Sequence, residues 1–202
     1  MLIIGEKKLE QITEKEVSRR QLIGGLAALV GATAFSNPAF ASIPKSPLLK
    51  AKPARFLAFD NLHTGEKIKI TYWENGAYIK GALKEINYIL RDHRNNQQTK
   101  MDKALLDKLF VLHNKLGSKA AFQVISGYRS PASNSAIHSA SSQVAKHSMH
   151  LEGKAIDIRL RDVSTSNIKR AALAMRSGGV GYYPTSDFVH IDTGKTRSWG
   201  GA

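Results

Sequence analysis

The chain has 202 residues and carries 30 lysines and arginines against 16 aspartates and glutamates, with no cysteine. The absence of cysteine excludes disulfide bonds, thiolate metal sites and a cysteine nucleophile, so metal ligands in this chain must be His, Asp or Glu side chains. The excess of positive charge favours polyanionic partners, although such charge also serves simply to keep a protein soluble.

The amino-terminal segment has the pattern of an export signal. Arg19 and Arg20 precede an apolar run from Leu22 to Phe35, and Ala39-Phe40-Ala41 then supplies the small residues that a signal peptidase recognises. Residues 1–41 are therefore predicted to be a twin-arginine signal peptide, with the Tat translocase as partner during export and the periplasm as destination. A retained membrane anchor is the alternative, but the run is shorter than the roughly 20 residues of a membrane span. We expect no stable span in the mature form.

Without residues 1–41, the chain keeps 161 residues and a net charge of +13. This length is that of one domain with a core of its own. The basic residues are scattered and no recognition motif of aromatic and basic residues occurs, so nucleic acid is not expected as a partner. An acidic cell envelope suits an exported basic protein better.

Residues 42–54 hold three prolines among lysines and predict an extended leader without a core pattern. The folded domain is expected to span residues 55–202. Arg55 to Asp60 and Glu66 to Trp73 predict two strands around a turn at residues 63–65, because apolar and polar side chains alternate along the second of them.

Two further stretches have apolar residues at helical spacing. They predict helices over Gly81 to Arg94 and Asp102 to Leu116, the second ending at Gly117. His93 and His113 lie on these predicted helices. A single imidazole without a spaced partner is more typical of a surface or packing residue than of a metal ligand.

The middle of the chain predicts a strand over Ala121 to Ser126, followed by the turn Gly127-Tyr128-Arg129-Ser130-Pro131. The serine-rich stretch from Ser130 to Ser148 is expected to be a loop with a short helix. Ser164 to Arg176 predicts another helix, which starts at a Ser or Thr and ends at Gly178-Gly179.

Side chains alternate along two more predicted strands. Over Lys154 to Leu160 the aliphatic residues occupy one face, so Asp157 points to the other face, away from the hydrophobic layer. Over Phe188 to Asp192 the same alternation separates His190 from the aliphatic residues. If these two strands are neighbours, Asp157 and His190 converge.

His150, Asp157 and His190 are the ligand set that a catalytic zinc ion uses. Two imidazoles and one carboxylate leave the fourth tetrahedral position open to water, and an open site of this kind is catalytic. The alternatives are a plain hydrogen-bonded pair of His150 with Asp157, and ordinary strand polarity at His190 and Asp192. His147 would form an i, i+3 ligand pair with His150 if that stretch were helical. These residues alone predict a zinc hydrolase of an amide or ester.

The pattern Ser-x-His-x-x-Gly-x-Ala-x-Asp over Ser148 to Asp157, followed by a carboxylate three residues before a second histidine, resembles the zinc D-Ala-D-Ala metallopeptidases. The resemblance implies an α+β fold of the hedgehog/DD-peptidase type, with a central antiparallel sheet, helices packed on one side and a zinc cleft. Residues Arg55 to Gly65, Leu90 to Arg94 and Gly127 to Ser130, together with the twin-arginine signal, are most similar to the exported murein endopeptidase K branch.

By matching positions, the resemblance implies that His150, Asp157 and His190 bind one zinc ion, that Asp187 is the general base and that Arg129 holds a substrate carbonyl or carboxylate. A second role stays open for two of them. Asp187 would instead orient a metal ligand, and Arg129 would instead fix its own turn.

Two further residues are implied near the site, His147 as a substrate group or a neighbour of the ligands, and Asp192 as a residue that orients a ligand or braces its strand. The implied reaction is hydrolysis of an amide in the peptide stems of peptidoglycan, with a cross-link as the preferred target. A D-Ala-D-Ala carboxypeptidase and a non-catalytic wall-binding module that holds zinc are the alternatives.

Overall fold

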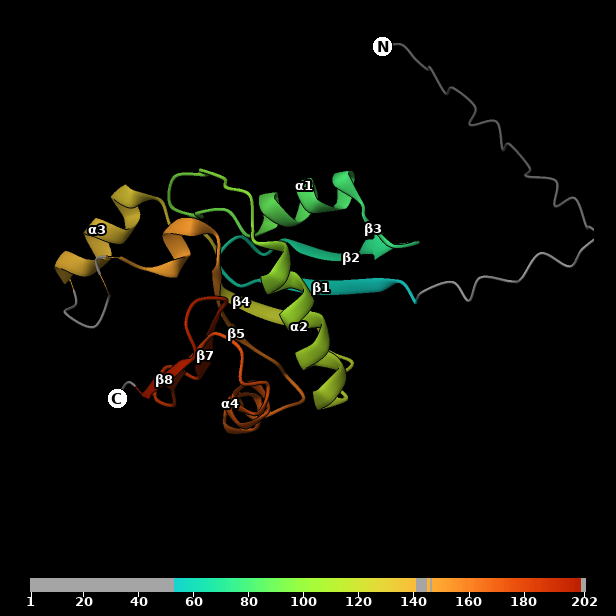
Figure 1. Cartoon of the computed structure of the whole chain (residues 1–202). Helices are drawn as coiled ribbons and strands as arrows, with labels where there is room; N and C mark the ends of the chain where they lie inside the picture. Colours follow the sequence, from blue (N-terminus) through green and yellow to red (C-terminus); the bar gives the residue numbers. More distant parts are fainter. Residues whose placement is uncertain (1–52, 141–144, 146, 201–202) are drawn as a thin grey trace, which may run out of the picture. The chain divides into compact units, whose positions relative to one another are not determined.

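The computed structural model of the chain describes residues 53–140, 145 and 147–200 (Figure 1). The predicted signal, residues 1–41, and the predicted leader up to residue 52 lie outside the described residues. No helix in the part of the chain that the structure describes combines the length and apolar character needed to cross a membrane.

An eight-stranded sheet is the framework of the domain. Its strands lie in the spatial order β3-β2-β1-β4-β5-β7-β6-β8. The strands are β1 (Arg55–Asn61), β2 (Lys67–Glu74), β3 (Ala77–Tyr78), β4 (Phe122–Ser126), β5 (Ala155–Arg159), β6 (Gly179–Tyr183), β7 (Phe188–Asp192) and β8 (Arg197–Gly200).

The expectation was a central antiparallel sheet, and the sheet is antiparallel except for two parallel pairs of strands. β1 pairs with β4 in parallel and β6 pairs with β8 in parallel, whereas the other neighbouring strands run antiparallel. A parallel pair requires a crossover connection, and the chain between β1 and β4 is long enough to hold two strands and two helices. After β7 the chain turns back and joins the far side of β6, so β8 runs in the same direction as β6.

Three helices cover the apolar face of the sheet: α1 (Lys80–Ile89), α2 (Lys103–Leu116) and α4 (Thr165–Ala174). In Figure 1, α2 crosses in front of the strands between α1 and α4. The fully buried side chains of Leu105, Leu109, Ile156 and Ile191 belong to the core that these layers enclose. A fourth helix, α3 (Pro131–Ala140), follows β4, and a short 3-10 helix, η1 (Met149–Glu152), precedes β5.

The helix ends follow from local side chains. The Asp102 carboxylate accepts a hydrogen bond from the backbone of Ala104 at 3.0 Å and begins α2, and Gly117 ends it in the left-handed conformation. The helix predicted over residues 81–94 ends earlier, at Ile89. Asp92 accepts backbone hydrogen bonds from Arg94 and Ser130 instead, and these bonds tie the loop after α1 to the segment that follows β4.

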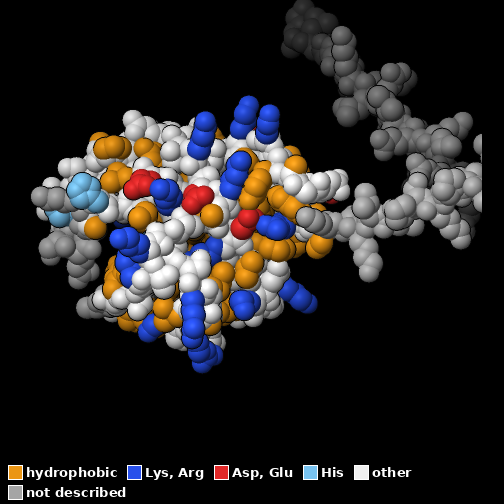
Figure 2. Space-filling model, in the orientation of Figure 1, with side chains coloured by type: hydrophobic (Ala, Val, Ile, Leu, Met, Phe, Trp, Pro, Cys, Tyr) orange, Lys and Arg blue, Asp and Glu red, His pale blue; other side chains and the backbone are white. Residues whose placement is uncertain are grey.

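The surface keeps the basic character of the sequence. Lys and Arg side chains project from the face seen in Figure 2, with acidic side chains among them. Some exposed acids pair with neighbours, such as Glu152 with Lys154 at 2.7 Å. Individual exposed pairs of this kind contribute little to stability. The excess of Lys and Arg therefore acts mainly through the electrostatic potential at the protein surface.

Candidate metal centre and active site

The short helix η1 delivers His150 to the site. Ser148 Oγ accepts a hydrogen bond from the backbone of His150 at 3.3 Å and starts the turn, and Gly153, with φ of +65°, ends it. A Cβ atom at Gly153 would lie 2.8 Å from the carbonyl oxygen of Lys100. The spacing of Ser148, His150 and Gly153 is therefore the spacing of one tight turn that needs glycine at its end.

Strands β5 and β7 deliver the other two side chains. They pair antiparallel, and Asp157 lies directly opposite His190. Ile156 and Ile191 are fully buried in the core on the other face. The predicted alternation and the predicted convergence of Asp157 with His190 are confirmed in the structure.

The three side chains meet in one buried cluster. His150 Nε2 lies 3.2 Å from Asp157 Oδ1 and 3.2 Å from His190 Nδ1, and the last two atoms are 2.8 Å apart. His150 is 1% exposed, Asp157 3% and His190 8%. Among residues 53–140, 145 and 147–200, these three form the group of ligand-type side chains close enough together to hold a metal ion.

The donor atoms fit a tetrahedral zinc ion. Bonds of about 2.0–2.1 Å at the tetrahedral angle separate neighbouring ligand atoms by roughly 3.3 Å, close to the spacing seen here. His150 Nδ1 lies 2.6 Å from the carbonyl oxygen of Gly127. Because a carbonyl oxygen only accepts hydrogen bonds, the proton of the His150 ring is on Nδ1 and the lone pair is on Nε2. When both imidazoles are neutral, two nitrogen lone pairs and a carboxylate oxygen face one another, an arrangement that a cation stabilises.

Burial and charge act in opposite directions on the cluster. Burial lowers the pKa of His150 and keeps its ring neutral. Burial also opposes protonation of His190, but hydrogen bonds to Asp157 and Asp192 outweigh it and raise the pKa of His190. Burial alone would raise the pKa of Asp157, yet the two imidazoles hold that pKa well below its usual range. The cluster thus retains its carboxylate charge and accepts either a proton on His190 or a metal ion.

Asp192 orients His190 from behind. Its Oδ2 lies 3.1 Å from His190 Nε2, so Nε2 donates and Nδ1 is left to face the cluster. The Asp192 side chain is fully buried and also accepts hydrogen bonds from the backbone of Gly179 and Gly194 and from Arg197. Burial alone would raise the pKa of Asp192, but these donors together lower it strongly.

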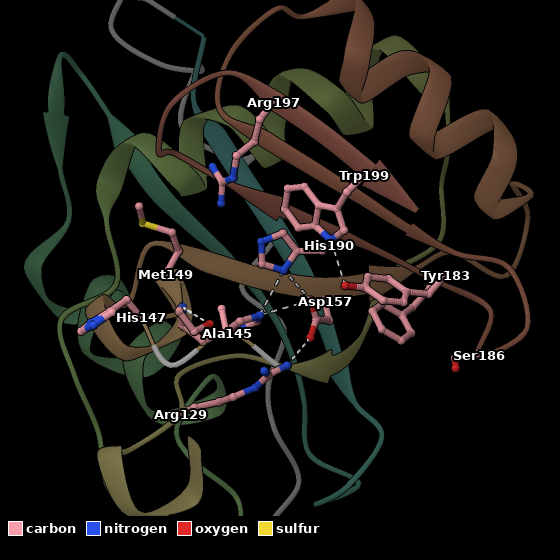
Figure 3. A pocket seen from close by; sticks show the side chains of 13 residues that line it. Arg129, Ala145, His147, Met149, Asp157, Tyr183, Ser186, His190, Arg197 and Trp199 are labelled. Atoms are coloured by element: carbon pink, nitrogen blue, oxygen red, sulfur yellow. Dashed lines mark hydrogen bonds and ion pairs between the residues drawn. The ribbon is translucent and has the colours of Figure 1, made fainter. Parts of the chain in front are cut away.

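Arg129 lies against the proposed ligand Asp157. Its Nη2 donates to Asp157 Oδ2 at 2.6 Å and its Nε donates to Ser126 Oγ at 2.9 Å. Arg129 also lines the pocket at the cluster, so it both fixes the carboxylate and faces the cavity (Figure 3).

The other predicted residues lie outside the cluster. His147 is exposed at the pocket wall, beyond the turn that carries His150. Asp187 adopts a left-handed conformation with φ of +49°, and its carboxylate accepts hydrogen bonds from Thr165 Oγ1 at 3.0 Å and Arg159 at 3.4 Å. Asp187 does not line the pocket, although its two neighbours do. The structure therefore does not bring Asp187 to the cluster.

The isolated histidines lie elsewhere. His93 stacks on His63 with ring centres 3.8 Å apart, and His113 lies 2.8 Å from the carbonyl oxygen of Ala120 through Nε2. Neither belongs to the metal-ligand group of the described residues.

A cavity of about 360 Å³ opens over the cluster. Its wall on the side of β6 to β8 contains Phe188, from the predicted strand β7, and three residues that the sequence pattern did not identify: Tyr183, Arg197 and Trp199. Tyr183 belongs to β6, and Arg197 and Trp199 belong to β8, two strands that the hydrophobic pattern did not predict. For β6, the signal in the sequence was the alternation of glycine with apolar and aromatic residues over residues 179–183. Glycine inside a strand often marks a place where another side chain packs closely against the backbone.

Comparisons with known proteins agree with this geometry. The family model described as peptidoglycan L,D-endopeptidase MepK matches residues 49–199. The chain is 43% identical over 186 residues to the peptidoglycan L,D-endopeptidase MepK of Escherichia coli strain K12, covering 91% of this chain and 98% of the relative. It is 39% identical over 180 residues to the probable peptidoglycan L,D-endopeptidase MepK of Haemophilus influenzae, covering 89% and 92%. No solved structure matches the chain. The chain thus belongs to the MepK family of peptidoglycan L,D-endopeptidases.

Proposed function

We propose that this chain is a zinc-dependent peptidoglycan endopeptidase that hydrolyses an L,D amide bond in cross-linked peptide stems, in a fold of the hedgehog/DD-peptidase type. The observation that carries the proposal is the convergence of His150, Asp157 and His190 at the floor of the cavity. The names of the relatives supply the substrate class and the configuration of the bond.

His150 Nε2, Asp157 Oδ1 and His190 Nδ1 are the atoms that would hold the zinc ion. A bound zinc ion in such a site supplies a Lewis acid and lowers the pKa of water to about 7. The chain's own residues prepare the site for it. Gly127 and Asp192 fix which imidazole nitrogens face inward, and Arg129 fixes the Asp157 carboxylate.

Arg129 is proposed to bind the substrate as well. Its side chain is 15% exposed, and Nη1 makes no hydrogen bond to any described residue. A guanidinium keeps its charge at every physiological pH, so it attracts a stem carboxylate or the carbonyl oxygen of the amide under attack.

The role of Asp187 as general base stays a prediction from the resemblance. In the structure its carboxylate contacts Thr165 and Arg159, so proton transfer at the cluster would require the turn at residues 184–187 to move. His147 stands at the pocket wall and is proposed as a substrate contact.

Export by the twin-arginine route to the periplasm is proposed from Arg19 and Arg20 and the cleavage pattern at residues 39–41. The test is cell fractionation of the full chain and of an Arg19→Lys, Arg20→Lys variant. The wild type should be found in the periplasm and the variant in the cytoplasm. Equal export of both would overturn the route.

Hydrolysis of purified sacculi tests the proposed function. The protein is incubated with sacculi, with and without a chelator, and released muropeptides are identified by mass. Loss of cross-linked dimers joined through L,D bonds is expected, with recovery of activity after zinc is added back. Release of terminal D-Ala alone would identify a carboxypeptidase, and binding to sacculi without release would identify a wall-binding module.

A further inference from the structure

An aromatic wall stands beside the metal-ligand cluster, on the same face of the sheet. Tyr183 lies opposite Phe188 in the β6–β7 pair, and Gly181 lies opposite both His190 in β7 and Trp199 in β8. Because side chains of paired residues project to the same face, Tyr183 and Trp199 share the face of His190. All of these except Gly181 line the cavity (Figure 3).

Trp199 is held in one position by its neighbours. Its ring centre lies 5.1 Å from that of His190, and a Cβ atom at Gly181 would lie 2.7 Å from the indole. Only glycine at residue 181 therefore leaves room for the ring. The Arg197 guanidinium also lies 4.9 Å from the indole ring centre while donating to Asp192 at 2.6 Å.

The indole N–H in turn orients the hydroxyl of Tyr183. Trp199 Nε1 donates to Tyr183 Oη at 2.9 Å. An indole nitrogen is only a donor, so the phenol oxygen is the acceptor and its own proton is left to donate elsewhere. No acceptor for that proton occurs among the described residues. Stacking of the Tyr183 ring on Phe188, at 4.5 Å and 17°, fixes the direction of the side chain.

Figure 3 shows the Tyr183 hydroxyl directed toward the cluster, with Arg129 on another side of Asp157. We propose that Tyr183 is a catalytic residue whose O–H donates a hydrogen bond to the carbonyl oxygen of the scissile amide, and that Trp199 is the positioning residue for it. This inference rests on the proposed function, because it assigns a role within the same hydrolysis.

The proposed role of Tyr183 is electrostatic, and the residue is chemically unchanged by the reaction. Water adds to the carbonyl carbon, the amide C–N bond breaks and the departing nitrogen takes a proton, while Tyr183 keeps its own proton throughout. As negative charge develops on the carbonyl oxygen, a donor already aimed at it strengthens without reorganising. Such a donor accelerates the reaction more than it tightens ground-state binding, so its loss lowers kcat more than it changes KM.

The first experiment replaces the hydroxyl alone. Tyr183→Phe, assayed on a soluble stem dimer joined through an L,D bond, is expected to lower kcat at least about tenfold with KM within about twofold and with full zinc content. Tyr182→Phe is the matched control, since Tyr182 packs on the opposite face and lies 4.7 Å from the Lys169 ammonium through its ring. It is expected to keep wild-type kcat.

The second experiment tests the positioning role. Trp199→Phe keeps an aromatic ring and removes the N–H donor, so we expect a loss of about threefold to tenfold in kcat in the wild-type background and no further loss in the Tyr183→Phe background. Equal loss in both backgrounds would overturn the role of Trp199.

Other outcomes separate the two proposals. Full kcat in Tyr183→Phe, or loss of its zinc, would overturn the catalytic role of Tyr183 while leaving the endopeptidase intact. A wild-type chain that hydrolyses no stem amide would overturn the proposed function and the role of Tyr183 with it.

Discussion

Asp192 Oδ2 lies 3.1 Å from Nε2 of His190, and this contact decides which nitrogen of the imidazole faces the cluster. A carboxylate in this position holds the tautomer and increases the basicity of the ring nitrogen that binds a metal. The consequence is that a residue outside the proposed ligand set controls the affinity of the site.

We expect Asp192→Asn to weaken zinc binding by about tenfold to a hundredfold. Asparagine lacks the negative charge of the carboxylate, and its NH₂ group would face the hydrogen-bond donors that Asp192 accepts from. Competition with a chromogenic chelator measures the affinity. Glu152→Gln is the control, since the Glu152 side chain is 55% exposed and pairs with Lys154 at the surface. Unchanged zinc affinity in a folded Asp192→Asn protein would contradict the orienting role.

Gly153→Ala tests the turn that carries His150. The left-handed backbone costs an alanine roughly 1–2 kcal/mol, and the added Cβ would also approach the Lys100 carbonyl oxygen to 2.8 Å. We expect a larger loss of unfolding free energy than in Gly65→Ala, where φ is +72° but nothing lies within 4 Å of the added atom. Urea denaturation measures both. Equal losses would show that the contact with Lys100 relaxes freely.

Asp107 anchors β1, β2 and β3 to α2, and it carries a prediction about pH. The carboxylate accepts hydrogen bonds from Arg55, Tyr72 and Tyr78 at 2.7–2.9 Å. Burial alone would raise the pKa of Asp107, but these donors outweigh burial and lower it. A lowered pKa in the folded state stabilises the protein above the unfolded pKa of about 3.9, and that stability is lost as the pH falls through the folded pKa.

Asp107→Asn is therefore expected to cost about 1–3 kcal/mol of unfolding free energy at pH 7. The difference from wild type should persist down to about pH 4 and narrow below it. Denaturation curves across this pH range measure the effect, with Glu85→Gln on the exposed side of α1 as control. A difference that grows on acidification would contradict the sign of the pKa shift.

Asp187→Asn decides whether this carboxylate carries the proton. If Asp187 is the general base that the resemblance predicts, kcat falls by about a hundredfold or more while zinc is retained. The turn at residues 184–187 must then move when substrate binds, because the carboxylate contacts Thr165 and Arg159 in the structure. A kcat within about tenfold of wild type would contradict the role of Asp187 as base and leave its carboxylate a structural role with Thr165 and Arg159.

Period-two alternation explains why the centre of the site was predictable. Once Ile156 and Ile191 are assigned to the core, Asp157 and His190 must project to the opposite face, and neighbouring antiparallel strands place them side by side. Ser148 and Gly153 likewise start and end a local turn. The position of His150 within that turn could therefore be predicted without knowledge of contacts to distant residues.

Features set by distant contacts were not predictable. The early end of α1 depends on Asp92, whose carboxylate bonds to the backbone of Ser130, which is 38 residues away. β6 contains Gly179 and Gly181, which interrupt the hydrophobic pattern. Side chains from other strands pack against both glycines, Asp192 and Arg197 against Gly179 and Trp199 against Gly181. The position of Asp187 depends in the same way on contacts across the fold, with Thr165 and Arg159.

β8 is the outermost strand of the sheet, yet it contributes Arg197 and Trp199 to the cavity. An outermost strand has a row of backbone groups without a neighbouring strand, and such segments fray at a lower free-energy cost than central ones. β5 and β7, which carry Asp157 and His190, are flanked on both sides. Gentle warming should thus inactivate the protein before the cooperative melting of the domain, with the metal still bound.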